Sequence, residues 1–249
     1  MIDNNEIYEG LKAGEFFLEY LPTISLVDGR CVGAEALSRW RRPSGIVPPG
    51  EFIPLIENTP LSGLLTYWVI DTLAAELGDW LRENPEAHVS INVPPEILGR
   101  GGLEYASTKS GLREVSSQII LEVTERGIPD RLGMDALTTT TDLGVRIALD
   151  DVTLTGINLV VHSRINFDII KIDRSLVAQI DPQCPEPDWL KGLKAVPSST
   201  KLEFIAEGVE TEAQVGALRA AGIQMVQGFY YSRPIPANEF LAYYYKTVG

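Results

Sequence analysis

Short apolar runs recur along this chain, and a stretch with room for a helix separates each run from the next. They are HVSINV, QIILEV, VRIALD, DIIKID, EFIAE and QMVQG, beginning at residues 88, 118, 145, 168, 203 and 224. Strand-like runs that alternate with helices favour parallel strands joined by crossover helices. This alternation of apolar runs with helix-length segments constrains the fold more than any other feature of the sequence.

A different pattern opens the chain. Two β-leaning runs within residues 16–40 flank Asp28 and Gly29, a dipeptide suited to the positive φ angles of a tight hairpin turn. We therefore expect an antiparallel pair before the six runs. About eight strands in 249 residues favour the α/β class, as a (β/α) TIM-like barrel rather than an open sheet.

Three intervening segments predict helices. Residues 64–81 carry apolar side chains at helical spacing, namely Leu65, Trp68, Val69, Leu73, Leu77 and Leu81. Thr211 and Gln214 form a capping-box pattern, and Gly222 stands where that helix would end. Residues 237–246 are the third candidate. The proline-containing stretch 181–200 instead predicts a loop-rich connection.

Composition limits the classes of function. The net charge of −13 argues against binding a nucleic acid polymer or an anionic membrane. Cys31 and Cys184 are the two cysteines, so the sequence has no disulfide framework, and its start resembles neither an export signal nor a membrane span. We expect a single cytoplasmic domain over residues 1–249 with no membrane contact of its own.

Polar side chains gather where the predicted strands end. A barrel brings the carboxyl ends of its strands to one face, where catalytic groups collect. Each group alone is best explained as a charge that reaches solvent, but five carboxylates on one rim repel by on the order of 4 kcal/mol per close pair. Compensating cations are therefore expected. The residues are Glu35, Asn92, Glu122, Asp150, Asp151, Lys171, Glu207 and Gln227.

The donor types predict the metal. Adjacent Asp150 and Asp151 can serve one site only where the strand gives way to a loop, and we expect Asp150 to bridge two ions. The histidines, His88 and His162, do not stand at strand ends, and no thiolate cluster exists. Oxygen ligands therefore favour Mg²⁺ or Mn²⁺ over zinc or copper.

Lys171 is flanked by Ile169, Ile170 and Ile172, and an ammonium in such a run is costly to bury without a nearby opposite charge. One interpretation is a structural ion pair with an acidic neighbour. The interpretation we favour is a lysine that orients the water attacking an electrophile.

The sequence resembles the EAL family of cyclic di-GMP phosphodiesterases. The matching segments follow the family order between about Phe16 and Phe240: EALSRW, FIPLIE, SINVPPEIL, LEVTER, LGVRIALDD, IIKIDRSLV, AEGVETEAQ and VQGFYYSRPIP. The resemblance implies a barrel whose first strand runs antiparallel to the others. It also implies hydrolysis of cyclic di-GMP to linear pGpG with two Mg²⁺ or Mn²⁺ ions, by a homodimer.

The resemblance also implies roles for individual residues. Metal ligands are expected at Glu35, Asn92, Glu122, Asp150, Asp151 and Glu207. Catalytic roles are expected at Lys171, Glu35, Asp151 and Gln227, with Glu125 and Glu210 as supporting carboxylates. Substrate contacts are expected at Arg39, Leu37, Asn92 and Asp173, with Arg39 holding a phosphate.

The chain departs from the family pattern at several positions. Family members usually have DDFGTGYSSL where this chain has DDVTLTGINL, so Val152 and Thr153 follow the aspartates. Leu21 replaces a frequent glutamine, and Pro94 replaces a serine. The altered loop bears on turnover and regulation more than on ligand binding, and no predicted metal ligand is lost.

Two other functions compete with hydrolysis. The altered loop would suit a catalytically weak or inactive receptor that holds cyclic di-GMP and signals through partners. Apart from the resemblance, an enolase-like barrel could use Lys171 as a base with one Mg²⁺. The number of carboxylates fits two metals better than one.

Overall fold

Eight strands close into a barrel in this computed structural model, which describes residues 2–124, 131–142, 144–153, 167–194 and 201–248. The order around the barrel is β1, β9, β8, β7, β6, β5, β4 and β2, and β1 pairs with β2 to close it. The strands are β1 (Phe16–Ser25), β2 (Cys31–Arg42), β4 (His88–Asn92), β5 (Ile119–Thr124), β6 (Arg146–Val152), β7 (Ile169–Ile172), β8 (Glu203–Ala206) and β9 (Met225–Val226). The predicted TIM-like barrel is confirmed.

The first strand runs against its neighbours. β1 is antiparallel to both β2 and β9, whereas the other barrel pairs are parallel. Gly29 in the connecting turn has a φ of 77°, as the dipeptide predicted, whereas Asp28 does not have a positive φ. The connection spans residues 26–30, so it is longer than the tight turn we expected. β2 continues well past Glu35, and Trp40 pairs with Phe16. A short additional strand, β3 (Gly45–Val47), extends this hairpin beyond the barrel.

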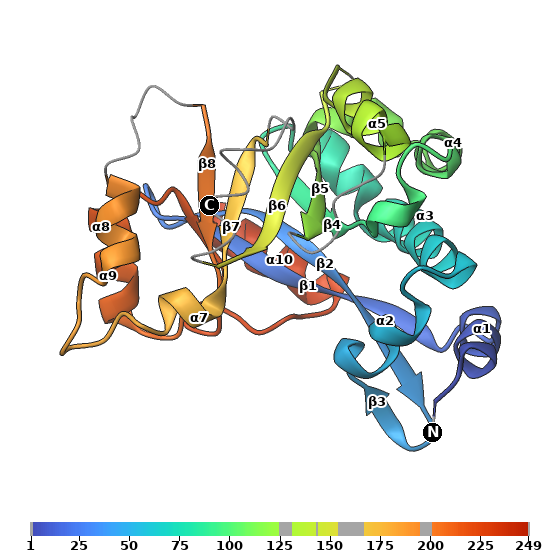
Figure 1. The fold of residues 1–249 in the computed structure, drawn as a ribbon, viewed down its shortest axis with the longest axis horizontal. Coiled ribbons are helices and arrows are strands. Elements are labelled where there is room, and N and C mark those ends of the chain that lie inside the picture. Colours follow the sequence, from blue (N-terminus) through green and yellow to red (C-terminus); the bar gives the residue numbers. More distant parts are fainter. Residues whose placement is uncertain (1, 125–130, 143, 154–166, 195–200, 249) are drawn as a thin grey trace.

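Helices surround the barrel (Figure 1). α3 (Pro60–Glu83), α4 (Gly102–Ser110) and α5 (Arg131–Asp142) lie on one side, with α7 (Arg174–Val177), α8 (Asp188–Lys194) and α9 (Glu212–Ala220) on the other. α10 (Ala237–Val248) packs against β1 and β2, and α1 (Asn4–Lys12) and α2 (Pro49–Ile56) lie near the far end of the hairpin. The 3₁₀ helices η1 (Pro95–Ile97) and η2 (Leu112–Gln118) lie in the connections.

The three predicted helices are present. Thr211 and Gln214 make both capping-box hydrogen bonds at the start of α9, and Gly222 has a φ of 83° just beyond its end. In the stretch predicted to be loop-rich, α8 forms directly after Pro187, and residues 195–200 lie outside the described part. Among the described residues, no helix combines the length and apolar character that a membrane crossing requires.

Apolar packing in the described residues divides into three clusters. The largest joins the outer faces of the strands to the helices, through residues such as Leu73, Leu121 and Phe240. A second cluster, with Trp40 and Phe52 near its centre, anchors α1 and α2 to the extended hairpin. The third fills the barrel interior and consists of Ile120, Ala148, Ile169, Ile205 and Met225, which we call the inner apolar layer.

Candidate active site

The polar site residues lie directly above the inner apolar layer. Side chains two positions apart on a strand face the same side, so each residue of the layer is followed by a polar residue that is also directed inward. The pairs are Ile120 with Glu122, Ala148 with Asp150, Ile169 with Lys171, Ile205 with Glu207, and Met225 with Gln227. The apolar side chains thus separate this polar layer from the amino-terminal end of the barrel.

Lys171 is the centre of the polar layer. Its side chain is 1% exposed, and its Nζ lies 2.7 Å from Glu207 Oε1 and 2.8 Å from Glu122 Oε2. The same nitrogen lies 3.0 Å from Glu35 Oε2 and 3.2 Å from Asp150 Oδ1. We call these four acidic groups the carboxylate cage. One ammonium thus contacts acidic groups from four different strand segments, which joins them into a single electrostatic unit.

The pKa values of this unit are strongly perturbed. Burial raises the pKa of Glu122 well above 4.5, and the nearby charges of Glu35 and Asp150 act in the same direction. Burial also raises the pKa of Glu207 to about 8. Burial favours a lower pKa for Lys171, but the surrounding carboxylates together raise it well above 10.5. The lysine therefore stays charged, whereas Glu122 and Glu207 hold protons more tightly than they would in water.

Asp150 and Asp151 face one site because the backbone of β6 is locally irregular. Asp151 has a φ of 56°, and the pairing with β7 changes register between Leu149 and Val152. One carboxylate oxygen from each of Asp150, Asp151 and Glu207 lies within 4.8 Å of the others. We expected the strand to end at the aspartates, but it continues to Val152. A left-handed residue inside the strand, rather than its end, brings the two carboxylates together.

The donor set suits a hard divalent cation. Both oxygens of Glu122 and Asp150 Oδ1 are buried. Apart from the ion-pair contacts of Glu122 Oε2 and Asp150 Oδ1 with Lys171, these atoms have no hydrogen-bond partner among the described residues. Carboxylate oxygens with spare acceptor capacity are the ligands that Mg²⁺ and Mn²⁺ prefer. His88 begins β4, the strand that Asn92 ends, and His162 lies outside the described residues. The residues present therefore fit the expected metals.

Two amide side chains adjoin the cage. Asn92 Nδ2 donates to Glu35 Oε1 at 3.1 Å, which leaves its carbonyl oxygen available to a ligand. Gln227 Nε2 donates to Thr23 Oγ1 at 2.9 Å, and its buried Oε1 has no hydrogen-bond partner in the described residues. Thr23 was not among the predicted residues, because a threonine in a β-leaning run gives no local signal of a site.

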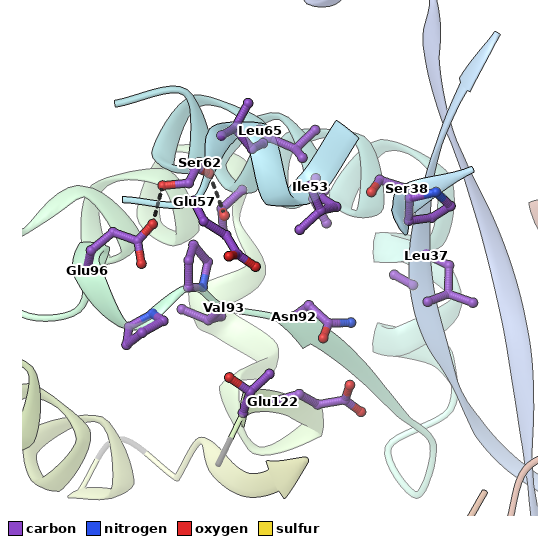
Figure 2. Close-up of a pocket in the computed structure, with 18 of the residues that line it drawn as sticks. Leu37, Ser38, Ile53, Glu57, Ser62, Leu65, Asn92, Val93, Glu96 and Glu122 are labelled. Carbon is purple, nitrogen blue, oxygen red and sulfur yellow. Dashed lines mark hydrogen bonds between the residues drawn. The ribbon is translucent and has the colours of Figure 1, made fainter. Parts of the chain in front are cut away.

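A cavity of about 830 Å³ adjoins the polar layer. Glu35, Leu37, Asn92, Glu122 and Asp151 line it on the barrel side. Figure 2 shows Asn92 and Glu122 across the cavity from Ser62 and Leu65, which belong to α3. The volume lies in the range of pockets that enclose small-molecule ligands.

Other predicted site residues lie elsewhere. Arg39 does not line this cavity, and its Nε donates to Glu19 Oε2 at 2.8 Å. Asp173 caps α7 by accepting from the backbone N–H of Ser175. Glu210 is exposed just before α9, and Glu125 lies outside the described residues. Their proposed roles remain predictions.

The far wall of the cavity was not predicted from the sequence. It includes Glu57 and Asn58, between α2 and α3, together with Glu96 and Arg100. The positive φ of Asn58, 58°, matches the tolerance of asparagine for this conformation. That preference could have indicated a turn, but nothing local indicates that the turn faces the strand ends.

Comparison with known proteins matches almost the whole chain to one protein family. Residues 4–234 match the family model described as the EAL domain. The chain is 32% identical over 247 residues to the probable cyclic di-GMP phosphodiesterase PdeB of Escherichia coli strain K12. This match covers 96% of the chain but 46% of PdeB, so the chain spans less than half the length of that relative.

Solved structures share the fold. The EAL enzyme Bd1971, in its cAMP- and cyclic di-GMP-bound form, matches with a TM-score of 0.82 and 29% identity, covering 96% of this chain and 67% of that one. The phosphodiesterase PaMucR, in complex with cyclic di-GMP, matches with a TM-score of 0.80 and 29% identity. That match covers 95% of this chain and 98% of the PaMucR chain.

Proposed function

Because this chain belongs to the EAL domain family, we propose that it hydrolyses cyclic di-GMP to linear pGpG. The observation that carries the proposal is the carboxylate cage around Lys171, which borders a cavity of about 830 Å³. The names of PdeB and the PaMucR complex support the substrate. An unusually charged buried site beside a cavity is where catalysis is expected.

Two Mg²⁺ or Mn²⁺ ions would be held by the carboxylates of Glu35, Glu122, Asp150, Asp151 and Glu207 with the Asn92 amide oxygen. When bound, such ions lower the pKa of a coordinated water and neutralise charge on a phosphate. Since pGpG keeps its phosphate on the 5′ oxygen, water oxygen attacks phosphorus, the bond from phosphorus to the 3′ oxygen breaks, and that oxygen gains a proton.

The chain's own residues orient this reaction. Lys171 remains protonated, so it acts as a hydrogen-bond donor that fixes the position of the attacking water rather than as a base. Gln227 Oε1 has an unused acceptor position among the described residues and accepts a hydrogen bond from the same water. Asp151 contributes charge that matters more in the transition state than in the bound substrate.

Hydrolysis is tested by incubating the purified protein with cyclic di-GMP in Mg²⁺ or Mn²⁺ and measuring pGpG by chromatography. We expect Asp151→Asn to lower kcat much more than it weakens substrate binding. Asp188→Asn is a matched control, because this carboxylate is almost fully exposed on α8 and pairs with Lys191. Wild-type protein that makes no more pGpG than Asp151→Asn would overturn the proposal.

A second candidate is a cyclic di-GMP receptor without turnover. Val152 and Thr153, which replace the usual Phe-Gly after the aspartates, favour it. Binding of cyclic di-GMP by calorimetry, with no pGpG in either metal, would establish the receptor instead.

We also propose that the protein acts in the cytoplasm as a homodimer. Both cysteines, buried Cys31 and exposed Cys184, are free thiols, which suits a reducing compartment. The family resemblance supports the dimer, and light scattering of the purified chain tests it.

A further inference from the structure

The turn between α2 and α3 presents a fixed edge to the cavity. Glu96 Oε1 accepts from the backbone N–H of Asn58 at 2.7 Å and from the Ser62 hydroxyl at 2.8 Å. The N–H of Glu57 donates to Ile53 O at 3.2 Å, and the Thr59 hydroxyl donates to Ile56 O at 2.7 Å. These bonds hold the backbone of the turn on both sides of Glu57.

Glu57 differs from Glu96 in how its carboxylate is used. Glu96 uses Oε1 to hold the turn, whereas the carboxylate of the exposed Glu57 makes no hydrogen bond or ion pair with the residues that the structure describes. Glu57 lines the cavity, and Figure 2 shows its side chain directed toward the side where Val93 and Asn92 lie. A fixed backbone thus supports an acceptor with two unused oxygens.

We propose that Glu57 determines base specificity by binding the Watson–Crick edge of one guanine of the substrate; this inference rests on the proposed function. On that edge guanine has two adjacent donors, the N1–H and the exocyclic amino group. A carboxylate offers two parallel acceptors and no donor. The match is therefore bidentate, as in other pairings of a planar side chain with two polar atoms of a base.

The same cavity supplies apolar surface for the faces of a base. Ile53, Pro94 and Pro95 line it together with Glu57. Pockets for small ligands commonly combine apolar walls with a few polar groups that fix orientation. Pro94, which departs from the family serine, adds to this apolar wall.

Adenine would be rejected at the same position. Its Watson–Crick edge has an acceptor at N1 beside one amino donor, so a carboxylate would face a lone pair. A glutamine at residue 57 would instead provide one donor and one acceptor, which complements adenine. Glu57→Gln should therefore change selectivity as well as affinity.

The experiment measures binding of cyclic di-GMP and cyclic di-AMP by calorimetry, in Ca²⁺ and in EDTA. We expect Glu57→Gln to weaken cyclic di-GMP binding on the order of tenfold to a hundredfold. Binding of cyclic di-AMP should stay equal or become tighter. Glu51→Gln is the matched control: Glu51 is an exposed acid on α2 outside the cavity, and its substitution should leave both affinities unchanged.

The outcomes separate this inference from the proposed function. If wild-type protein binds cyclic di-GMP and Glu57→Gln binds it equally well, the role of Glu57 is overturned while the proposed function stands. An equal loss of affinity for both dinucleotides would also overturn base recognition. If wild-type protein binds neither dinucleotide and makes no pGpG, both proposals are overturned.

Discussion

Replacing Lys171 with methionine should make folding depend on divalent cations. Methionine has a similar length, so the substitution removes the ammonium while it preserves most of the packing. At an effective dielectric of 20, unit charges 3 Å apart attract by about 5.5 kcal/mol, and Nζ lies 2.7 to 3.2 Å from four carboxylates. Desolvation and carboxylate repulsion offset much of this attraction.

The net change in the free energy of unfolding is therefore best estimated from other proteins. Removing one partner of a buried ion pair lowers that free energy by about 3–5 kcal/mol. Since a domain is stable by about 5–15 kcal/mol, Lys171→Met should lose a large share of its free energy of unfolding in EDTA. An ion at a hundred times its Kd would restore about 2.7 kcal/mol. The loss should be larger near pH 8 than near pH 6, because protonation of the carboxyl groups relieves repulsion at the lower pH.

Urea unfolding, followed by circular dichroism in EDTA and in Mg²⁺, measures both effects. Lys191→Met is the control, since Lys191 and its partner Asp188 are solvent-exposed, and its unfolding curve should match wild type. If Lys171→Met unfolds in EDTA at the same urea concentration as wild type, the lysine does not offset the negative charge of the carboxylate cage, and the predicted electrostatic stabilisation is wrong.

Two further predictions concern the same layer. Because burial raises the folded-state pKa of Glu207 to about 8 from 4.5, the folded protein binds this proton more tightly, and stability in EDTA should fall as pH rises from about 4.5 through about 8. Thermal unfolding across that pH range measures the fall in stability. Glu207→Gln should reduce the slope of stability against pH, and an unchanged slope would contradict the assignment of the raised pKa to Glu207. Thr23→Val should lower the free energy of unfolding by about 1–3 kcal/mol, because it leaves the buried Gln227 amide without its acceptor. Urea unfolding tests this change, and a variant as stable as wild type would contradict the importance of that bond.

Much of the barrel could be predicted because its signals are local. Each interior strand combines a short apolar run with a polar residue at its carboxyl end, and Gly29 supplies the turn that the first hairpin requires. Period-two patterns and turn residues are properties of a few neighbouring positions. They also place Glu122 and Lys171 on the inward face of their strands.

The packing of α1 and α2 against the hairpin of β1 and β2 could not be predicted in the same way. The core of this packing joins Ile7, Phe16, Trp40, Val47 and Phe52, which come from separate segments and show no single periodic pattern. β2 continues past Glu35 because β1 pairs with it as far as Trp40, so its length depends on a tertiary partner. The position of Glu57 on the cavity wall follows from this packing, so no local sequence pattern indicates it.

The adjacent aspartates lead to one more prediction. In a regular strand Asp150 and Asp151 would point to opposite faces. The left-handed conformation of Asp151 costs most non-glycine residues about 1–2 kcal/mol, and aspartate less. Asp151 also adds a negative charge beside Asp150 and Glu207. Asp151→Gly should relieve both effects, so the metal-free protein should gain about 1 kcal/mol of stability while metal binding and turnover fall. Unfolding in EDTA and calorimetry with Mn²⁺ measure the two changes. A less stable variant in EDTA would mean that the interactions which Asp151 makes outweigh its strain, and the local geometry would then serve folding rather than the site.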